Sequence, residues 1–256
     1  MKYKSVIALP LALTLLLTAC GGGDSPVSSP ASGMSAPPVT SPLADPVEAD
    51  GRLRVGLSHG LPGLGMTELV ERAEELVPCL LTLEQEQEVA DQLLDGRLDG
   101  ALVSPVAGLE LYHQSGGTLC IVAALTVELP AEQKLWPALG LPDAWEEEVP
   151  VVGSVLMLST RTLGERSVEW ANLLARCQHS LEQALAHPEQ AGKGMEQMGL
   201  VADGTLPTRI LTQCQPVLVQ GPTMAAALTS FYECLFQLDP TALSGGLPDD
   251  GIYYLS

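Results

Sequence analysis

The chain has 256 residues, of which 46% are hydrophobic and 4% aromatic, and 31 acidic side chains oppose 12 basic ones. This length permits one large domain or two small ones, and the apolar fraction is sufficient for a hydrophobic core. The formal charge of −19 excludes nucleic acid as a partner, because its phosphates would repel the chain. Six cysteines without metal-ligand spacing predict neither a disulfide scaffold nor a structural metal site, and no motif calls for a cofactor.

The first twenty residues are typical of an export signal. Lys2 and Lys4 precede the apolar run Val6–Leu17. As a helix this run would reach about 18 Å, well short of the roughly 30 Å hydrocarbon core of a bilayer, so it indicates a secretory signal and not a membrane span. The run ends in Leu-Thr-Ala-Cys20, followed by three glycines, and this resembles the lipobox of a bacterial lipoprotein. The resemblance implies that Cys20 is lipidated; an ordinary signal peptide that contains a cysteine is the alternative.

Residues 21–50 are predicted to form a disordered tether. Sixteen of these thirty residues are Gly, Pro or Ser, and they show no apolar periodicity. Such a segment cannot bury enough surface to order itself. The folded domain is therefore predicted to span residues 51–256.

Strands and helices alternate in the first part of this domain. Strands are predicted at Leu53–Leu57, Cys79–Leu83, Gly100–Val103 and Leu119–Ala124, and helices between them at Met66–Val77, Glu84–Asp95 and Val106–His113. This order predicts a parallel sheet with right-handed crossovers. A fifth strand is predicted at Val151–Ser159, followed by helices at Ser167–Ala186, Glu189–Met198 and Thr223–Leu238. The fold class is thus α/β, with a mostly parallel, roughly five-stranded sheet and flanking helices.

Three stretches carry a resemblance to a known family. They are Leu94–Pro105, Val151–Ser159 with the long helix after it, and Asp239–Tyr254 with its Gly-Gly-Leu-Pro-Asp-Asp-Gly sequence. Their order resembles the substrate-binding lipoproteins of bacterial ABC transporters, which have the type-2 periplasmic-binding-protein fold. The similarity is to the branch of nitrate, sulfonate and thiamine-precursor carriers. It implies two α/β lobes with a ligand cleft between them.

The chain departs from that pattern where the second lobe should be. About 25 residues separate Thr126 from the strand at Val151. A lobe with its own core normally needs about 50 residues or more. The second lobe is therefore predicted to be absent or reduced to a loop, which leaves residues 51–256 as a single lobe.

Ligands of open parallel sheets bind beyond the carboxyl ends of the strands. This rule selects Ser58, His59, Gly60, Leu61 and Pro62 after the first strand, Ser104 and Pro105 after the third, Leu125 and Thr126 after the fourth, and Ser159–Thr160 after the fifth. The glycine-rich loop after Gly60 either binds an anion through backbone N–H groups or only lets the chain reverse. The sequence leaves both interpretations open.

No catalytic constellation is recognisable. His59 lacks an identifiable partner, which favours a ligand contact or a surface position over catalysis. Cys79 and Cys120 are predicted to be buried thiols, and Cys177, Cys214 and Cys234 leave the disulfide pairing open. One disulfide, such as Cys214 with Cys234, is compatible with export.

The resemblance implies a non-catalytic solute-binding component of an ABC importer, or a reduced relative of one. It would be held by its lipid at the extracytoplasmic face of the cell membrane, bind an anionic or heterocyclic solute and work with an ABC permease. The second hypothesis is an accessory or structural lipoprotein that kept the fold and lost solute binding, docking onto a transporter or forming a homodimer. A small enzyme on the same fold is the third, because a fold alone does not fix function.

Overall fold

The computed structural model describes residues 52–73, 79–128, 145 and 148–255. The predicted signal peptide and tether lie outside the described residues, and so does most of the segment between the fourth and fifth predicted strands. All described residues belong to one compact unit, residues 44–256.

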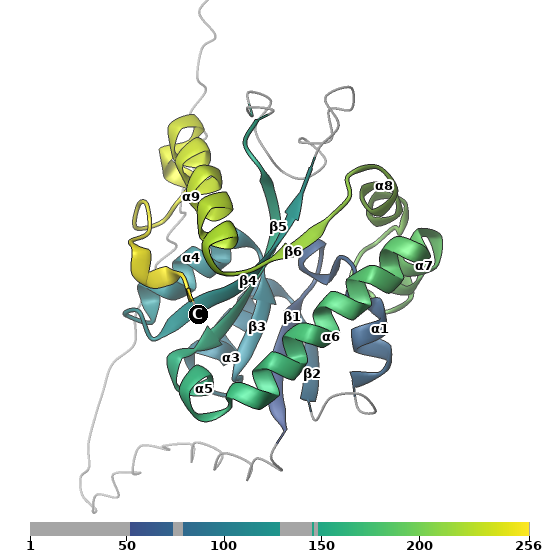
Figure 1. The fold of residues 1–256 in the computed structure, drawn as a ribbon, viewed down its shortest axis with the longest axis horizontal. Coiled ribbons are helices and arrows are strands. Elements are labelled where there is room, and N and C mark those ends of the chain that lie inside the picture. The colour runs from purple at the N-terminus through teal and green to yellow at the C-terminus, as the bar shows by residue number, and fades with distance from the viewer. Residues whose placement is uncertain (1–51, 74–78, 129–144, 146–147, 256) are drawn as a thin grey trace, which may run out of the picture. The chain divides into compact units, whose positions relative to one another are not determined.

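A six-stranded sheet forms the centre of the fold, in the order β2-β1-β3-β5-β4-β6 (Figure 1). The strands are β1 (Leu53–Ser58), β2 (Cys79–Glu84), β3 (Gly100–Val103), β4 (Leu119–Val127), β5 (Val151–Ser159) and β6 (Val217–Val219). The predicted α/β class is confirmed. The sheet has one strand more than expected, because three residues of β6 are too few to show a periodic pattern.

Four strands share one direction, and two oppose it. β1 pairs in parallel with β2 and β3, whereas β5 lies antiparallel between β3 and β4, and β6 is antiparallel to β4. The carboxyl ends of β1–β4 therefore meet the amino ends of β5 and β6 at one edge of the sheet, which we call the carboxyl edge. There Val127 pairs with Val151. The other edge, where β1–β4 begin, is the amino edge.

This topology corrects one sequence prediction. Ser159–Thr160 was expected to lie beside the other strand ends, but Ser159 pairs with Leu119, the first residue of β4. The end of β5 therefore lies at the amino edge. The prediction was wrong because an apolar strand looks the same in either direction, and the carboxyl-end rule holds only for strands that run parallel to one another.

Helices surround the sheet. They are α1 (Thr67–Glu71), α3 (Glu86–Leu94), α4 (Pro105–Gln114), α5 (Thr160–Glu165), α6 (Ser167–Ala186), α7 (Pro188–Gln197), α8 (Thr205–Gln213) and α9 (Gly221–Leu238), with 3₁₀ turns at Leu61–Gly63, Pro240–Ala242 and Asp250–Ile252. In Figure 1, α6 crosses the near face of the sheet, and α8 and α9 flank the projecting ends of β4 and β5. Among the described helices, none has the length and hydropathy needed to cross a bilayer.

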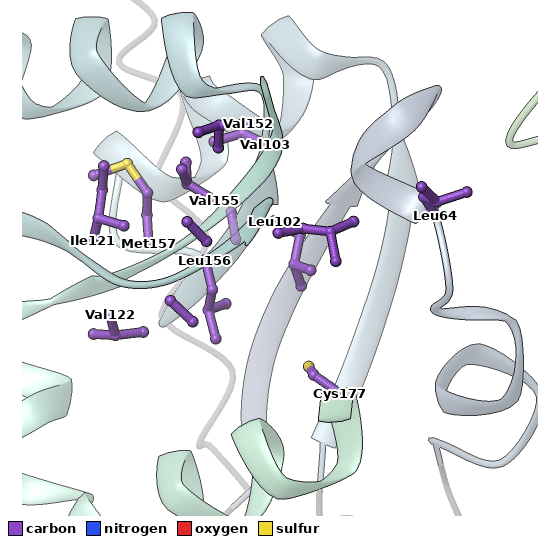
Figure 2. Close-up of a cluster of buried hydrophobic side chains, with 14 of the residues drawn as sticks. Leu64, Leu102, Val103, Ile121, Val122, Val152, Val155, Leu156, Met157 and Cys177 are labelled. Atoms are coloured by element: carbon purple, nitrogen blue, oxygen red, sulfur yellow. The ribbon is translucent and has the colours of Figure 1, made fainter. Parts of the chain in front are cut away.

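The core lies on both faces of the central strands. Ile121, Val155 and Met157 lie on one side of the strands, and Val122 and Leu156 lie on the side of Cys177 from α6 (Figure 2). All six side chains are buried. This alternation is the period of two that a strand imposes on its side chains. Helices on both faces explain why β4 and β5 are apolar along most of their length.

The cysteines in this core behave as apolar residues. Burial raises the pKa of the Cys120 thiol to about 11 and also raises the pKa of Cys214. Both are free buried thiols, so the buried character predicted for Cys120 is confirmed. The disulfide that the sequence allowed between Cys214 and Cys234 is not formed, because Cys214 is free. The side chain of Cys79 lies outside the described residues.

Whether the second lobe is missing stays a prediction. The strands within 52–73, 79–128 and 148–255 all belong to one sheet. The residues from which a second lobe would have to be built, 129–144 and 146–147, lie outside that part of the chain.

Candidate functional site

A cavity of about 410 Å³ opens at the carboxyl edge of the sheet. It is bounded by the loops after β1 and β3, the facing ends of β4 and β5, and helices α8 and α9. Among the described residues, its lining is apolar apart from the side chains of His59, Glu86 and Ser104. The lining residues are His59, Leu61, Pro62, Leu64, Glu86, Ser104, Pro105, Val106, Val127, Val151, Val152, Gly153, Ile210, Phe231, Leu235 and Ala242.

The polar end of the cavity is formed by His59, Glu86 and Ser104. Glu86, the first residue of α3, connects the end of β1 to the start of α4 there. Its Oε1 accepts hydrogen bonds from the Ser104 backbone N–H at 2.6 Å and from the Ser58 hydroxyl at 3.4 Å. Its Oε2 accepts one from the Ser104 hydroxyl at 3.1 Å. Ser104 also caps α4, because its Oγ accepts a hydrogen bond from the Ala107 N–H. The carboxylate therefore lies beside the first turns of both α3 and α4, where the helix dipoles favour negative charge.

His59 lies at the other side of this polar end. Its Nδ1 is 2.7 Å from the side-chain nitrogen of Gln85, and its backbone N–H donates to the Glu84 carbonyl at 3.0 Å. An amide nitrogen can only donate, so Nδ1 is the acceptor in this pair. The neutral tautomer that fits this contact carries its hydrogen on Nε2. His59 is thus available as a hydrogen-bond donor to a bound molecule.

The glycine-rich loop after β1 uses its backbone N–H groups internally. The Gly60 N–H donates to the Leu200 carbonyl at 2.7 Å, and the N–H groups of Gly63 and Leu64 donate to carbonyls within the loop. Gly60 has a φ of 95°, in the left-handed region that favours glycine. The structure therefore favours a chain reversal over an anion site.

Helix α9 contributes one aromatic side chain, Phe231, to the cavity wall. The ring of Phe231 lies 5.2 Å from that of Trp145 and 5.7 Å from that of Tyr232, measured between centroids. The buried Tyr232 hydroxyl donates to the Pro105 carbonyl at 2.7 Å, which fixes α9 against the start of α4. Burial raises the pKa of Tyr232 well above its ordinary value, so this hydroxyl remains a donor.

The structure gathers most of the predicted site residues at the cavity. His59, Leu61, Pro62, Ser104 and Pro105 line it. Ser58 and Gly60 do not line it. Ser58 donates a hydrogen bond to the lining residue Glu86, and the backbone of Gly60 donates one to Leu200.

Leu125 and Thr126 do not line the cavity. Strand β4 continues to Val127, three residues beyond the predicted end, so Leu125 is buried within the sheet. Thr126 donates its hydroxyl to the Val217 carbonyl of β6. Val127 lines the cavity in their place.

Sequence reasoning missed several lining residues. Glu86 follows the end of β2 by two residues, so the carboxyl-end rule applied to that strand would have found it. The rule could not select the start of β5, residues Val151, Val152 and Gly153, because it requires knowing that β5 is antiparallel. Ile210 and Phe231 come from helices far along the chain, and no local signal places them here.

A second, larger pocket lies at the amino edge, with a volume of about 980 Å³. Asp99 is one of the residues that line it. Asp99 Oδ2 accepts hydrogen bonds from the Arg54 backbone N–H at 2.8 Å and from Arg54 Nε at 3.1 Å, and Oδ1 accepts one from Arg54 Nη2 at 2.9 Å. Arg166 Nη1 lies 3.7 Å from Oδ2. Burial alone would raise the pKa of Asp99, but the hydrogen bonds from Arg54 and the charges of Arg54 and Arg166 outweigh it and lower that pKa.

Metal binding finds no support in the part of the chain that the structure describes. No group of three or more His, Cys, Asp or Glu side chains there could hold an ion.

Comparison with solved structures shows what this architecture resembles. An ABC transporter protein from Parabacteroides distasonis matches with a TM-score of 0.56 at 13% identity, over 80% of this chain and 99% of the other. The periplasmic aliphatic sulphonate binding protein SsuA from Escherichia coli matches with a TM-score of 0.53 at 14% identity, over 79% of this chain and 92% of the other.

A Candida albicans protein described as having the generic periplasmic binding protein fold matches with a TM-score of 0.50 at 10% identity, over 78% of this chain and 93% of the other. No family model matches the sequence, and no curated protein does. At these identities the likeness establishes the fold: the chain forms a lobe like that of a periplasmic binding protein.

Proposed function

We propose that the protein is a non-catalytic solute-binding component of an ABC importer, or a reduced relative of one, and that its solute binds in the carboxyl-edge cavity. The observation that carries this proposal is the cavity itself. Its volume of about 410 Å³ falls within the roughly 300–1,000 Å³ range of small-molecule sites. It also lies where α/β sheets bind ligands, on a fold shared with a sulphonate-binding protein.

The lining supports an uncharged, largely apolar body for the solute. Phe231, Leu235, Ile210 and the valines at the ends of β4 and β5 supply the surface that an aliphatic or aromatic group would bury. The described lining contains no lysine or arginine to neutralise an anion. Of the two solute classes that the sequence suggested, the heterocyclic one is therefore better supported than the anionic one.

Membrane attachment and a permease partner complete the proposal. Membrane attachment is supported by the lipobox-like sequence at Cys20 and the Gly/Pro/Ser-rich tether after it, and the permease partner by the fold shared with an ABC transporter protein. Two acyl chains would hold a soluble lobe at the membrane, since each buried methylene contributes about 0.8 kcal/mol. The lobe would then be tethered at the extracytoplasmic face of the cell membrane, where it could contact a permease.

A pair of glycine substitutions tests whether the cavity binds a solute. Gly153 lines the cavity, and a Cβ there would make only ordinary contacts, the nearest at 3.7 Å. Gly153→Leu should therefore fill the cavity without disturbing the strand. Gly164→Leu is the matched control, because Gly164 lies in α5 at the amino edge with open space around it.

Thermal-shift measurements with sulfonates, nitrate, thiamine precursors, amino acids, neutral aromatic compounds and aromatic amines provide the readout. A solute at 100 times its Kd stabilises the protein by about 2.7 kcal/mol. At least one compound should raise the melting temperature of the wild type and of Gly164→Leu, and Gly153→Leu should lose that shift. A shift that survives in Gly153→Leu would place binding elsewhere. No shift with any compound would favour the accessory lipoprotein, with docking to a transporter or homodimerisation as its role.

A further inference from the structure

Glu86 gives the carboxyl-edge cavity a negative charge that no side chain in the described lining neutralises. The other polar side chains of the lining are His59 and Ser104, and the described lining includes no lysine or arginine. We propose that the cavity selects amphipathic cations: solutes with an apolar body and an ammonium or similar charged N–H group that binds Glu86. This inference rests on the proposed solute-binding function and names the substrate class of the same cavity.

The hydrogen bonds of Glu86 leave room for a ligand. A carboxylate can accept about four hydrogen bonds. Glu86 Oε1 accepts two, from the Ser104 N–H and the Ser58 hydroxyl, while Oε2 accepts one, from the Ser104 hydroxyl. All three donors are neutral, so they orient the carboxylate without balancing its charge. An ammonium group that reaches Oε2 would supply both the missing donor and the missing charge.

The arrangement of positive charge in the molecule favours the same class of solute. Arg54, Arg161 and Arg166 line the pocket at the amino edge, which is the opposite edge of the sheet from Glu86. The chain as a whole carries 31 acidic and 12 basic side chains. An excess of acidic groups produces a negative potential, which concentrates cations in a cleft with low-dielectric walls. An anion would meet this potential and the Glu86 carboxylate together.

The remainder of the cavity recognises an apolar body. Phe231, Ile210 and Leu235 come from the two helices that flank the ends of β4 and β5. An aromatic or branched aliphatic group placed against them would bury its surface and leave its charged end at α3 and α4. A free metal ion or a small inorganic cation would leave this apolar surface uncovered and is not the class that the cavity fits.

Three probes of similar shape test the inference by isothermal titration calorimetry: 2-phenylethylammonium, 2-phenylethanol and 3-phenylpropanoate. The wild type should bind the ammonium compound at least about tenfold more tightly than the alcohol, and the carboxylate most weakly, because a hydrogen bond between charged groups is about twice as strong as a neutral one. Glu86→Gln keeps the shape and an acceptor oxygen, and should reduce that preference by about tenfold. Glu88→Gln is the matched control: Glu88 lies on the same helix, exposed, and accepts a hydrogen bond from the Gln85 N–H.

The outcomes separate this inference from the proposed function. Equal affinity of the wild type for the ammonium compound and the alcohol overturns the inference, and so does a preference that Glu86→Gln retains or that Glu88→Gln also loses. Binding of an anion from the earlier panel, with none of the three probes bound, overturns the inference and leaves the proposed function standing. If Glu86→Gln does not fold, the ranking of the probes by the wild type decides.

Discussion

The two edges of the sheet differ in how a half-buried carboxylate is paired. At the amino edge, Asp99 is in contact with Arg54 and lies 3.7 Å from Arg166, so the negative charge meets positive charge within the protein. At the carboxyl edge, the donors that Glu86 meets among the described residues are neutral groups of Ser58 and Ser104. Both carboxylates join separate segments of the chain, yet only one is neutralised.

This difference supports a structural role for Asp99 and the proposed binding role for Glu86. A carboxylate whose partners are arginines fixes the fold, and removing it takes away the acceptor of three Arg54 hydrogen bonds. A carboxylate held by neutral donors at the end of an apolar cavity is oriented but remains available to a ligand. The cavity wall at the carboxyl edge consists mostly of apolar side chains, whereas the amino edge contains ion pairs, so the substitutions below should lower stability for different reasons.

The largest effect is expected from the aromatic wall of the cavity. Phe231 is 2% exposed and packs between Trp145 and Tyr232. Phe231→Ala removes this packing and enlarges the cavity, which should lower the free energy of unfolding by about 3–5 kcal/mol in urea titrations.

Phe236→Ala is the matched control for this substitution. Phe236 lies on the same helix, is only partly buried and does not line the cavity. Its truncation should cost less than half as much as that of Phe231. Equal losses in the free energy of unfolding would show that the whole apolar face of α9 stabilises the protein. The cavity wall would then contribute no more than the rest of that face.

A smaller effect is expected from the ion pairs at the amino edge. Asp99→Ala removes the acceptor of the Arg54 backbone N–H and of two guanidinium hydrogen bonds, so the free energy of unfolding should fall by about 1–3 kcal/mol. Asp95 provides the control, because its pair with Arg97 is well exposed, with side-chain exposures of 64% and 61%. Asp95→Ala should cost about 0.5 kcal/mol or less. Solute binding should be unchanged in both variants, and a loss of binding in Asp99→Ala would contradict the separation of the two edges.

Much of the fold could be predicted from local patterns. Alternation and helical spacing located β1–β5 and most helices, and α6 begins and ends where its apolar spacing predicts, at Ser167 and Ala186. Helix α8 was missed because it is short and contains Pro207, which normally argues against a helix. Pro207 lies in the first turn of α8, where a missing N–H costs nothing.

The direction of β5 and the composition of the cavity could not be predicted locally. An apolar strand buried on both faces has no sequence feature that states its direction, so Ser159 was assigned to the wrong edge. The site depends on the same tertiary information. Ser104 and Pro105 were found because they follow a parallel strand, whereas Ile210 and Phe231 reach the cavity only through the packing of α8 and α9.

Acid should remove the contribution of the amino edge gradually. The pKa of Asp99 is lowered in the folded protein from its ordinary value of 3.8, so the unfolded chain binds this proton more tightly than the folded one. The stability that Asp99 contributes is therefore fully present above pH 3.8 and is lost as the pH falls through the lowered pKa. Asp99→Asn, which cannot titrate, should be less stable than the wild type at pH 7, and the difference should narrow as the pH falls from about 4 to 2. Urea titrations of both proteins across this range measure the difference, and a constant one would show that the interaction of Asp99 with Arg54 and Arg166 does not depend on its charge.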